Sequence, residues 1–173
     1  MKKLTREFYC RDVLQVAPDL IGKVLVRNIN GRLLRHRIVE TEAYRGEEDD
    51  ACHARFGKTN RNSVMYNAGG CAYVYLIYGM YWMFNIVTGA ERDPQAVLIR
   101  GVDVYPGPGK LTKALAIDKS FYGEDLVTSG RIWIESSLDR PAILLSPRVG
   151  IGYAGEPWKS IAWRYMLDPQ GRQ

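Results

Sequence analysis

Two short turns between alternating segments most strongly constrain how this chain can fold. One is "INGR", whose Asn30–Gly31 pair is typical of a tight β-hairpin between "KVLVRNI" and "RLLRHRIVETEAY". The other lies around Gly79, between the aromatic segments "CAYVYLIY" and "MYWMFNIVT". Neighbouring hairpins with few helices predict an antiparallel or mixed sheet, and therefore an α+β fold.

The remaining segments are expected to complete one domain. "QAVLIRGVDV", "RIWIESS" and "AILLSPRVGIG" are predicted to be strands, and a Trp-rich tail follows them. Helices are expected from about Phe8 to Leu20, ending near Gly22, and over "KLTKALAI". A chain of 173 residues can bury a core without metals or disulfides, so we expect a single domain over residues 1–173. Its sheet should be curved, with flanking helices and a protruding aromatic hairpin.

The charge and the tyrosines favour a nucleic-acid partner. The formal net charge is +5, and an excess of positive charge attracts polyanions. Charge alone would fit an ordinary basic protein equally well. However, the central members of the 11 tyrosines cluster along the chain, which suits rings that stack on bases.

The cysteines and the apolar segments predict a cytoplasmic protein without membrane contact. Cys10, Cys52 and Cys71 form no C-x-x-C pair, and we interpret them as reduced thiols. The start, "MKKLTREF", lacks the apolar region of a signal peptide. The longest nonpolar stretch, "AYVYLIYGMYWMFNIV", is shorter than the roughly 20 residues that a membrane helix needs.

Two carboxylates and a phenol alternate along the predicted strand "VETEAY". Glu40, Glu42 and Tyr44 therefore project from one face of an extended chain. Such a face fits either plain solvent exposure or the floor of a catalytic pocket. The irregular segment of residues 45–70 that follows is long for a small domain, and connections of this length are often functional.

The tyrosines of the aromatic hairpin could likewise have either a structural or a functional role. Tyr73, Tyr75 and Ile77 share one face of its first strand. Buried tyrosines must satisfy their hydroxyls, so such a face can line a stacking pocket as well as fill a core. Taken alone, the hairpin favours the core interpretation.

Common metal and nucleophile motifs are absent from the sequence. The possible zinc ligands are His36, Cys52, His53 and Cys71. Their spacing along the chain does not match that of a zinc site, so we expect no metal. No G-x-S-x-G elbow occurs, and "GPGKLT" departs from a P-loop because Leu111 follows Lys110. This segment is simply a turn that enters a helix, although Lys110 is a candidate contact to a DNA phosphate.

Taken together, several blocks resemble one known family. "IVETEAY", "DDACHARFGKTNRN", "YVYLIYGMYWMFNIV", "AVLIRG", "GPGKLTKALAIDKSF" and "RVGIGYAGE" follow one another as in the alkyladenine (3-methyladenine) DNA glycosylases. The resemblance covers roughly Phe8 to Trp163. It implies a monofunctional enzyme that flips damaged purines out of double-stranded DNA and hydrolyses their N-glycosidic bond, without a cofactor.

The resemblance also implies a catalytic group. Glu42 matches the residue that activates the attacking water, and Arg100 matches the arginine that helps to hold that water. The backbone carbonyl of Val149 resembles the third anchor. A carboxylate suits this chemistry, because it can stabilise an oxocarbenium-like state and orient water. Glu40 should lie on the same side, further from the sugar. It could face solvent or support the groups around Glu42, and the favoured interpretation is an ordinary surface glutamate.

A second set of positions matches the pocket for the flipped base. Tyr44, His53 and Tyr75 correspond to side chains that stack on the base or line its pocket. Asn85 corresponds to the side chain that discourages normal guanine. Alkylation at N3 or N7 makes a purine cationic, and tyrosine faces favour such a ring by about 1–2 kcal/mol.

A third set is expected to contact the DNA itself. Tyr78 matches the residue wedged into the duplex where the base has left, and Met80 matches a hydrophobic residue at the same tip. Flipping enzymes must fill the gap that the base leaves, and an aromatic side chain on a hairpin turn can do so. Lys110 and Lys119 are expected at the DNA backbone.

Two parts of the sequence depart from the family pattern. The chain between Arg100 and Lys110 is short, and the tail "PWKSIAWRYMLDPQGRQ" follows the usual ending only loosely. The expected substrates are 3-methyladenine, 7-methylguanine, ethenoadenine and hypoxanthine, and the expected protein is a bacterial or archaeal monomer that starts base excision repair. A non-catalytic nucleic-acid-binding module is the alternative, and Glu42 beside Arg100 argues against it. A strand-nicking lysine enzyme is disfavoured, because no lysine stands at a suitable position.

Overall fold

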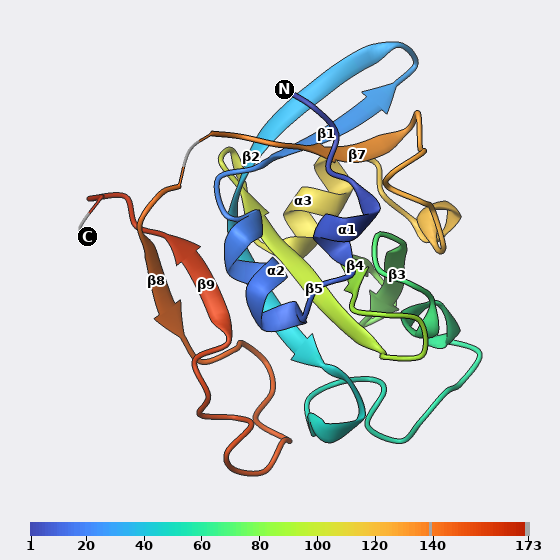
Figure 1. The fold of residues 1–173 in the computed structure, drawn as a ribbon, viewed down its shortest axis with the longest axis vertical. Coiled ribbons are helices and arrows are strands. Elements are labelled where there is room, and N and C mark those ends of the chain that lie inside the picture. The colour runs from blue at the N-terminus through green and yellow to red at the C-terminus, as the bar shows by residue number, and fades with distance from the viewer. Residues whose placement is uncertain (139, 172–173) are drawn as a thin grey trace.

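The computed structural model describes residues 1–138 and 140–171, and within them the strands form one curled sheet (Figure 1). The main path of the sheet runs through β3 (Ala72–Ile77), β4 (Tyr81–Thr88), β5 (Gln95–Val102), β2 (Arg32–Arg45), β1 (Val24–Ile29) and β7 (Ile132–Glu135). Three short strands are attached to it: β6 (Tyr105–Pro106) on β5, and β9 (Arg164–Leu167) on β2 with β8 (Ile143–Ser146) on β9. Each of these pairings is antiparallel, which confirms the predicted fold class.

Few helices accompany the sheet, namely α1 (Arg6–Tyr9), α2 (Val13–Leu20), α3 (Pro108–Ala114) and 3₁₀ turns at Gly46–Glu48, Ser63–Tyr66 and Lys119–Phe121. In Figure 1, α2 lies over one face of the sheet, in front of β2 and β5. The Thr41 hydroxyl donates to the carbonyl of Ala17 at 2.9 Å, so this face of β2 is turned toward α2. By alternation, Glu40, Glu42 and Tyr44 face the other side. Among the described residues, no helix is long and apolar enough to cross a membrane.

The predicted N-terminal helix is wrong in its continuity, because the structure divides it into α1 and α2. The carbonyls of Tyr9 and Arg11 both accept a hydrogen bond from the Gly89 N–H at 3.0 Å, instead of continuing a helix. Asp12 then caps α2 by accepting from the Leu14 N–H at 2.8 Å. A contact to the distant β4–β5 loop therefore breaks a segment that local periodicity predicts to be continuous.

The helix expected over "KLTKALAI" forms, with shifted ends. It begins at Pro108, whose fixed φ suits a first helical turn, and ends at Ala114. The Thr112 hydroxyl donates to the Trp82 carbonyl at 2.9 Å and ties α3 to β4. This helix therefore stands beside the aromatic hairpin.

Both predicted turns form, each with two successive left-handed residues. Asn30 and Gly31 have φ of 52° and 87°, and Tyr78 and Gly79 have φ of 50° and 67°. Glycine and asparagine adopt the left-handed conformation readily, whereas tyrosine adopts it rarely. At the second turn, Tyr78 is 84% exposed and Met80 is 65% exposed.

The C-terminal part contains a strand that the sequence did not indicate. β8 confirms part of the predicted strand "AILLSPRVGIG", but β9 comes from the tail, where no strand was expected. β9 pairs with β2 so that Arg164 lies opposite Glu42. The loop between β8 and β9 extends along the end of β2 (Figure 1). A late segment of the chain thus reaches the predicted catalytic strand.

Candidate active site

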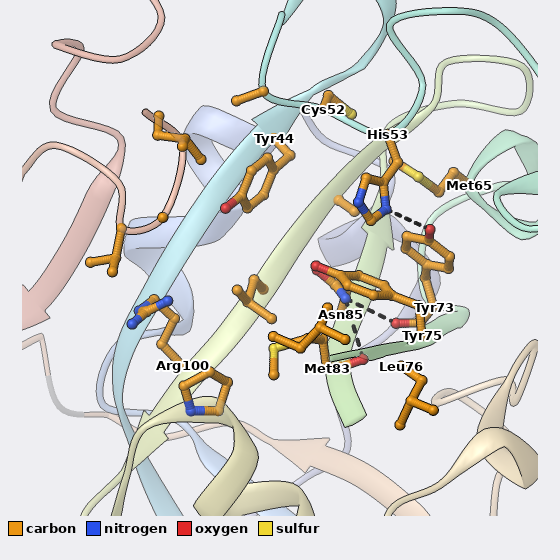
Figure 2. A pocket seen from close by; sticks show the side chains of 18 of the residues that line it. Tyr44, Cys52, His53, Met65, Tyr73, Tyr75, Leu76, Met83, Asn85 and Arg100 are labelled. Carbon is orange, nitrogen blue, oxygen red and sulfur yellow. Dashed lines mark hydrogen bonds between the residues drawn. The ribbon is translucent and has the colours of Figure 1, made fainter. Parts of the chain in front are cut away.

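A cavity of about 600 Å³ lies on the face of the sheet opposite α2 (Figure 2). Its walls come from β2, the irregular segment after it, the β3–β4 hairpin, β5 and the β8–β9 loop. The structure brings most of the predicted site residues to this one cavity: Tyr44, His53, Tyr75, Tyr78, Asn85, Arg100 and Val149. A cavity of this size can enclose a nucleobase and part of a sugar.

Glu42 lies behind this wall and has no exposed surface. Its Oε2 accepts from the Tyr44 hydroxyl at 2.8 Å, and its Oε1 accepts from the Val149 N–H at 2.7 Å. The Nε of Arg100 lies 3.5 Å from the same Oε1. A buried carboxylate requires such partners, because it has lost the water that would otherwise solvate it.

The surroundings of Glu42 shift the pKa values of two groups. Burial raises the pKa of Glu42, while Arg100, the Val149 N–H and the Tyr44 hydroxyl oppose this rise. Burial, followed by the charge of Glu42, raises the pKa of Tyr44 well above its ordinary value. Tyr44 therefore keeps its proton and donates a hydrogen bond to Glu42.

Arg100 owes its direction to a β-bulge. Glu40 pairs with Gly101 and Thr41 pairs with Ile99, so Arg100 is the extra residue of β5. Bulges of this kind re-aim a side chain, and here the guanidinium reaches the carboxylates of β2.

The interpretation of Glu40 as an ordinary surface glutamate is wrong. Its side chain is largely buried, and its Oε1 accepts from Arg100 Nε at 2.9 Å and from Arg164 Nε at 2.7 Å. The expectation that it lies on the same side as Glu42 is confirmed, since both contact Arg100. Its second partner comes from β9, which the sequence did not indicate.

A buried ion pair holds the β8–β9 loop against β2. Arg148 donates to the two carboxylate oxygens of Asp49 at 2.5 and 2.9 Å, and neither side chain is exposed. Arg148 also donates to the carbonyl of Ala43 at 2.9 Å. Val149 follows directly, so this pair fixes the N–H that binds Glu42. Sequence reasoning missed both partners, although Asp49 stands in the acidic run after the catalytic strand.

The opposite wall of the cavity is aromatic. In Figure 2, His53, Tyr73 and Tyr75 gather across the cavity from Tyr44 and Arg100. The Tyr73 hydroxyl lies 2.8 Å from His53 Nδ1, and the ring centroids of His53 and Tyr75 are 4.5 Å apart. Tyr73 is buried, as the core interpretation predicts, whereas Tyr75 keeps part of its surface toward the cavity.

Protonation of His53 is disfavoured at this wall. Burial lowers its pKa to about 4, and the positive charges of Arg61 and Arg55 contribute to the shift. The residue keeps accessible surface because it lines the cavity, but the aromatic wall removes much of its water. His53 is therefore a neutral hydrogen-bonding group at pH 7.

Asn85 is fixed at the floor of the cavity. Its amide nitrogen donates to the carbonyl of Tyr73 at 3.1 Å, so its orientation is set by the neighbouring strand (Figure 2). The residue is buried among apolar neighbours but still lines the cavity. A buried amide in a fixed orientation presents a fixed set of donors and acceptors, so it can discriminate between ligands by their hydrogen-bonding groups.

Of the four residues expected to contact DNA directly, only Tyr78 lines the cavity. Tyr78 and Met80 are exposed at the hairpin turn, and Tyr78 also borders the cavity. Lys110 is exposed on α3, two residues after Pro108, which lines the cavity. Lys119 is exposed in a 3₁₀ turn and does not reach the cavity wall. Within the described part of the chain, no cluster of His, Cys, Asp or Glu is arranged to hold a metal ion.

Comparisons with known proteins identify the relatives of this chain. The family model described as methylpurine-DNA glycosylase matches residues 7–107 and 102–170. Two relatives named "Putative 3-methyladenine DNA glycosylase" come from Desulfitobacterium hafniense, with 45% identity, and Natranaerobius thermophilus, with 44% identity. The alignments cover 97% and 95% of this chain, and 96% and 95% of the relatives. A third, of the same name, from Methanocella arvoryzae is 43% identical over 92% of each chain. The resemblance noted in the sequence is thus confirmed: the chain belongs to the methylpurine-DNA glycosylase family.

Proposed function

We propose that this protein is a monofunctional DNA glycosylase that hydrolyses the N-glycosidic bond of alkylated or deaminated purines. The observation that carries the proposal is Glu42, a buried carboxylate held by Arg100, Tyr44 and the Val149 N–H at the edge of a base-sized cavity. Family membership supports the same activity. The substrates proposed are 3-methyladenine, 7-methylguanine, ethenoadenine and hypoxanthine in double-stranded DNA.

The proposed reaction is attack of water on the anomeric carbon of the flipped nucleotide. Glu42 stabilises the developing positive charge of the sugar and takes a proton from the water. Arg100 and the Val149 carbonyl hold that water. Glu42 has no exposed surface, so no bulk water reaches its carboxylate. The attacking water must therefore enter the space beside Glu42 when the nucleotide binds. Burial raises the pKa of Glu42, and the positive charge of Arg100 opposes this rise and so favours the carboxylate form.

The aromatic wall accounts for base recognition in this proposal. The damaged base stacks between Tyr44 and Tyr75, with His53 at its edge. Cationic alkylpurines are good leaving groups, and tyrosine faces favour their charge by about 1–2 kcal/mol. Asn85 disfavours guanine through its exocyclic amine, while Tyr78 fills the gap in the duplex.

The wider setting of the protein follows from the same proposal. A chain that scans DNA works as a monomer in the cytoplasm, and residues 1–173 act as one glycosylase domain. Lys110 and Lys119 bind the DNA backbone through charge, so affinity should fall with added salt.

The test is base release from a duplex oligonucleotide that carries one hypoxanthine or ethenoadenine, with alkylated DNA as a further substrate. The wild type is compared with Glu42→Gln, which keeps the shape of the side chain and removes its charge. We expect wild-type product that appears as strand scission only after alkali, and no product from Glu42→Gln although DNA binding is retained.

Glu91→Gln is the matched control, because Glu91 is exposed in the β4–β5 loop away from the cavity. Undiminished release by Glu42→Gln would remove Glu42 from its role. Scission without alkali would indicate a lyase. DNA binding without release of any tested base would instead support the non-catalytic nucleic-acid-binding module.

A further inference from the structure

Glu42 is not the nearest anionic partner of Arg100. The Nε of Arg100 lies 2.9 Å from Oε1 of Glu40 and 3.5 Å from Oε1 of Glu42. The position of Arg100 beside the catalytic carboxylate is therefore set chiefly by Glu40. The bulge in β5 makes this dependence stronger, because Arg100 has no cross-strand partner on β2.

Glu40 is itself held by a second arginine. The Nε of Arg164 donates to the same Oε1 at 2.7 Å. The side chains of Arg100, Glu40 and Arg164 are only 15%, 16% and 24% exposed, so water screens them weakly. Two guanidinium groups and two carboxylates, including Glu42, thus form one compact and formally neutral cluster.

We propose that Glu40 and Arg164 are a positioning pair that holds Arg100 in place beside Glu42. Neither residue touches the cavity, so each acts through Arg100. Arg164 neutralises Glu40 and prevents it from drawing Arg100 further away from Glu42. The proposal rests on the glycosylase function proposed above, and it assigns a task to β9.

Removing the charge of Glu40 or of Arg164 should shift the pKa of Glu42 in opposite directions. The charged and titratable groups that face Glu42 come from the strands and the loop around it: Glu40, Tyr44, Tyr75, Arg100, Arg148 and Arg164. Loss of the positive charge of Arg164 disfavours the carboxylate form, so it raises the pKa of Glu42. Loss of the negative charge of Glu40 does the reverse, because Glu40 contributes to the raised pKa of Glu42.

The experiment measures single-turnover base release against pH for Arg164→Gln and Glu40→Gln. Both variants should release base about tenfold to a hundredfold more slowly at pH 7, with DNA affinity unchanged within about twofold, because only Arg100 is misplaced. The acidic limb of the profile should move to higher pH in Arg164→Gln and to lower pH in Glu40→Gln. The rate of the double variant at pH 7 should resemble that of Glu40→Gln alone, since Arg164 holds Arg100 through Glu40, whereas the two opposite shifts of the acidic limb should offset each other.

Two further variants separate positioning from stability. Arg164→Lys keeps the charge and should return the acidic limb to its wild-type position, even if the rate recovers only in part. Arg35→Gln breaks a comparable ion pair of β2, that of Arg35 with Glu135, outside the cavity, and should leave the profile unchanged.

Different outcomes contradict the positioning pair and the proposed glycosylase function. A wild type that releases no base overturns the glycosylase proposal itself. An active wild type, together with wild-type rates and profiles in Arg164→Gln and Glu40→Gln, overturns the positioning pair alone. A shift of the acidic limb in the same direction in both variants also overturns it.

Discussion

The two hairpin turns of this protein share a backbone conformation but not the residue that adopts it. Asn30 and Tyr78 have φ of 52° and 50°, and each precedes a left-handed glycine. Asparagine tolerates this conformation, whereas tyrosine bears a strain of about 1–2 kcal/mol. Tyr78 gains nothing from burial in return, since it is 84% exposed. A strained residue that gains no burial is typical of a functional position, so the difference supports the proposed contact of Tyr78 with DNA and gives no such support for Asn30.

The largest effect of exchanging these turn residues should appear in DNA binding. Tyr78→Asn removes the ring that is proposed to stack in the duplex, and such stacking is worth about 1–3 kcal/mol, or roughly fivefold to 150-fold in affinity. The loss should be greater on a duplex with an abasic site than on an intact duplex. Fluorescence anisotropy on both duplexes measures it.

Asn30→Tyr is the control for this exchange, because it adds a tyrosine to the other turn. It should leave both DNA affinities unchanged. Equal losses on the two duplexes in Tyr78→Asn would mean that the tyrosine only packs the hairpin.

The same two variants should have opposite, smaller effects on stability. Tyr78→Asn relieves the strained turn and should raise the free energy of unfolding by about 1 kcal/mol. Asn30→Tyr introduces that strain and should lower it by a similar amount. Urea unfolding of both variants and the wild type measures the change. If Tyr78→Asn unfolds more easily than the wild type, the ring stabilises the fold and the comparison of the two turns fails.

The smallest effect concerns the opposite end of the aromatic hairpin, where Tyr73 meets His53, because His53 is exposed and solvent screens its charge. The pKa of His53 is about 4 in the folded protein, against roughly 6.5 in an unfolded chain. Between these pH values His53 binds more protons in the unfolded chain than in the folded protein. The free energy of unfolding should therefore be unaffected by His53 above pH 6.5 and should fall as the pH is lowered toward 4. Urea midpoints at pH 7 and pH 5 should differ more in the wild type than in His53→Asn. An equal difference in both proteins would show that His53 titrates normally.

Local chemistry explains which parts of this fold could be predicted. The hairpins follow from alternation and from glycine turns, both of which are encoded within a few residues. The break between α1 and α2 could not be predicted, because it depends on hydrogen bonds from Gly89. β9 was missed for the same reason, since only its pairing with β2 and β8 identifies it as a strand.

The candidate site divides in the same way. Glu42, Tyr44, Tyr75 and Asn85 were named through the resemblance to the glycosylase family, and the structure gathers them at one cavity or directly behind its wall. The groups that hold Glu42 in place were harder to find. Asp49 and Arg148 form a pair between residues far apart in the chain, and Arg164 gives Glu40 a role that a surface glutamate does not have. A sequence motif indicates which groups react, whereas the packing of distant segments decides how they are supported.

The separation along the chain between Glu42 and its supports has a consequence during synthesis. The Val149 N–H that binds Glu42 lies 107 residues later, and the arginine that pairs with Glu40 lies 124 residues after it. Contacts of such long range form late, because the chain must first close large loops. A nascent chain that has left the ribosome only as far as α3 contains Glu42, Tyr44 and Arg100, but neither Val149 nor Arg164. We therefore expect Glu42 to be held less firmly in an unfinished chain, until the segment that carries Val149 and Arg164 has folded against β2.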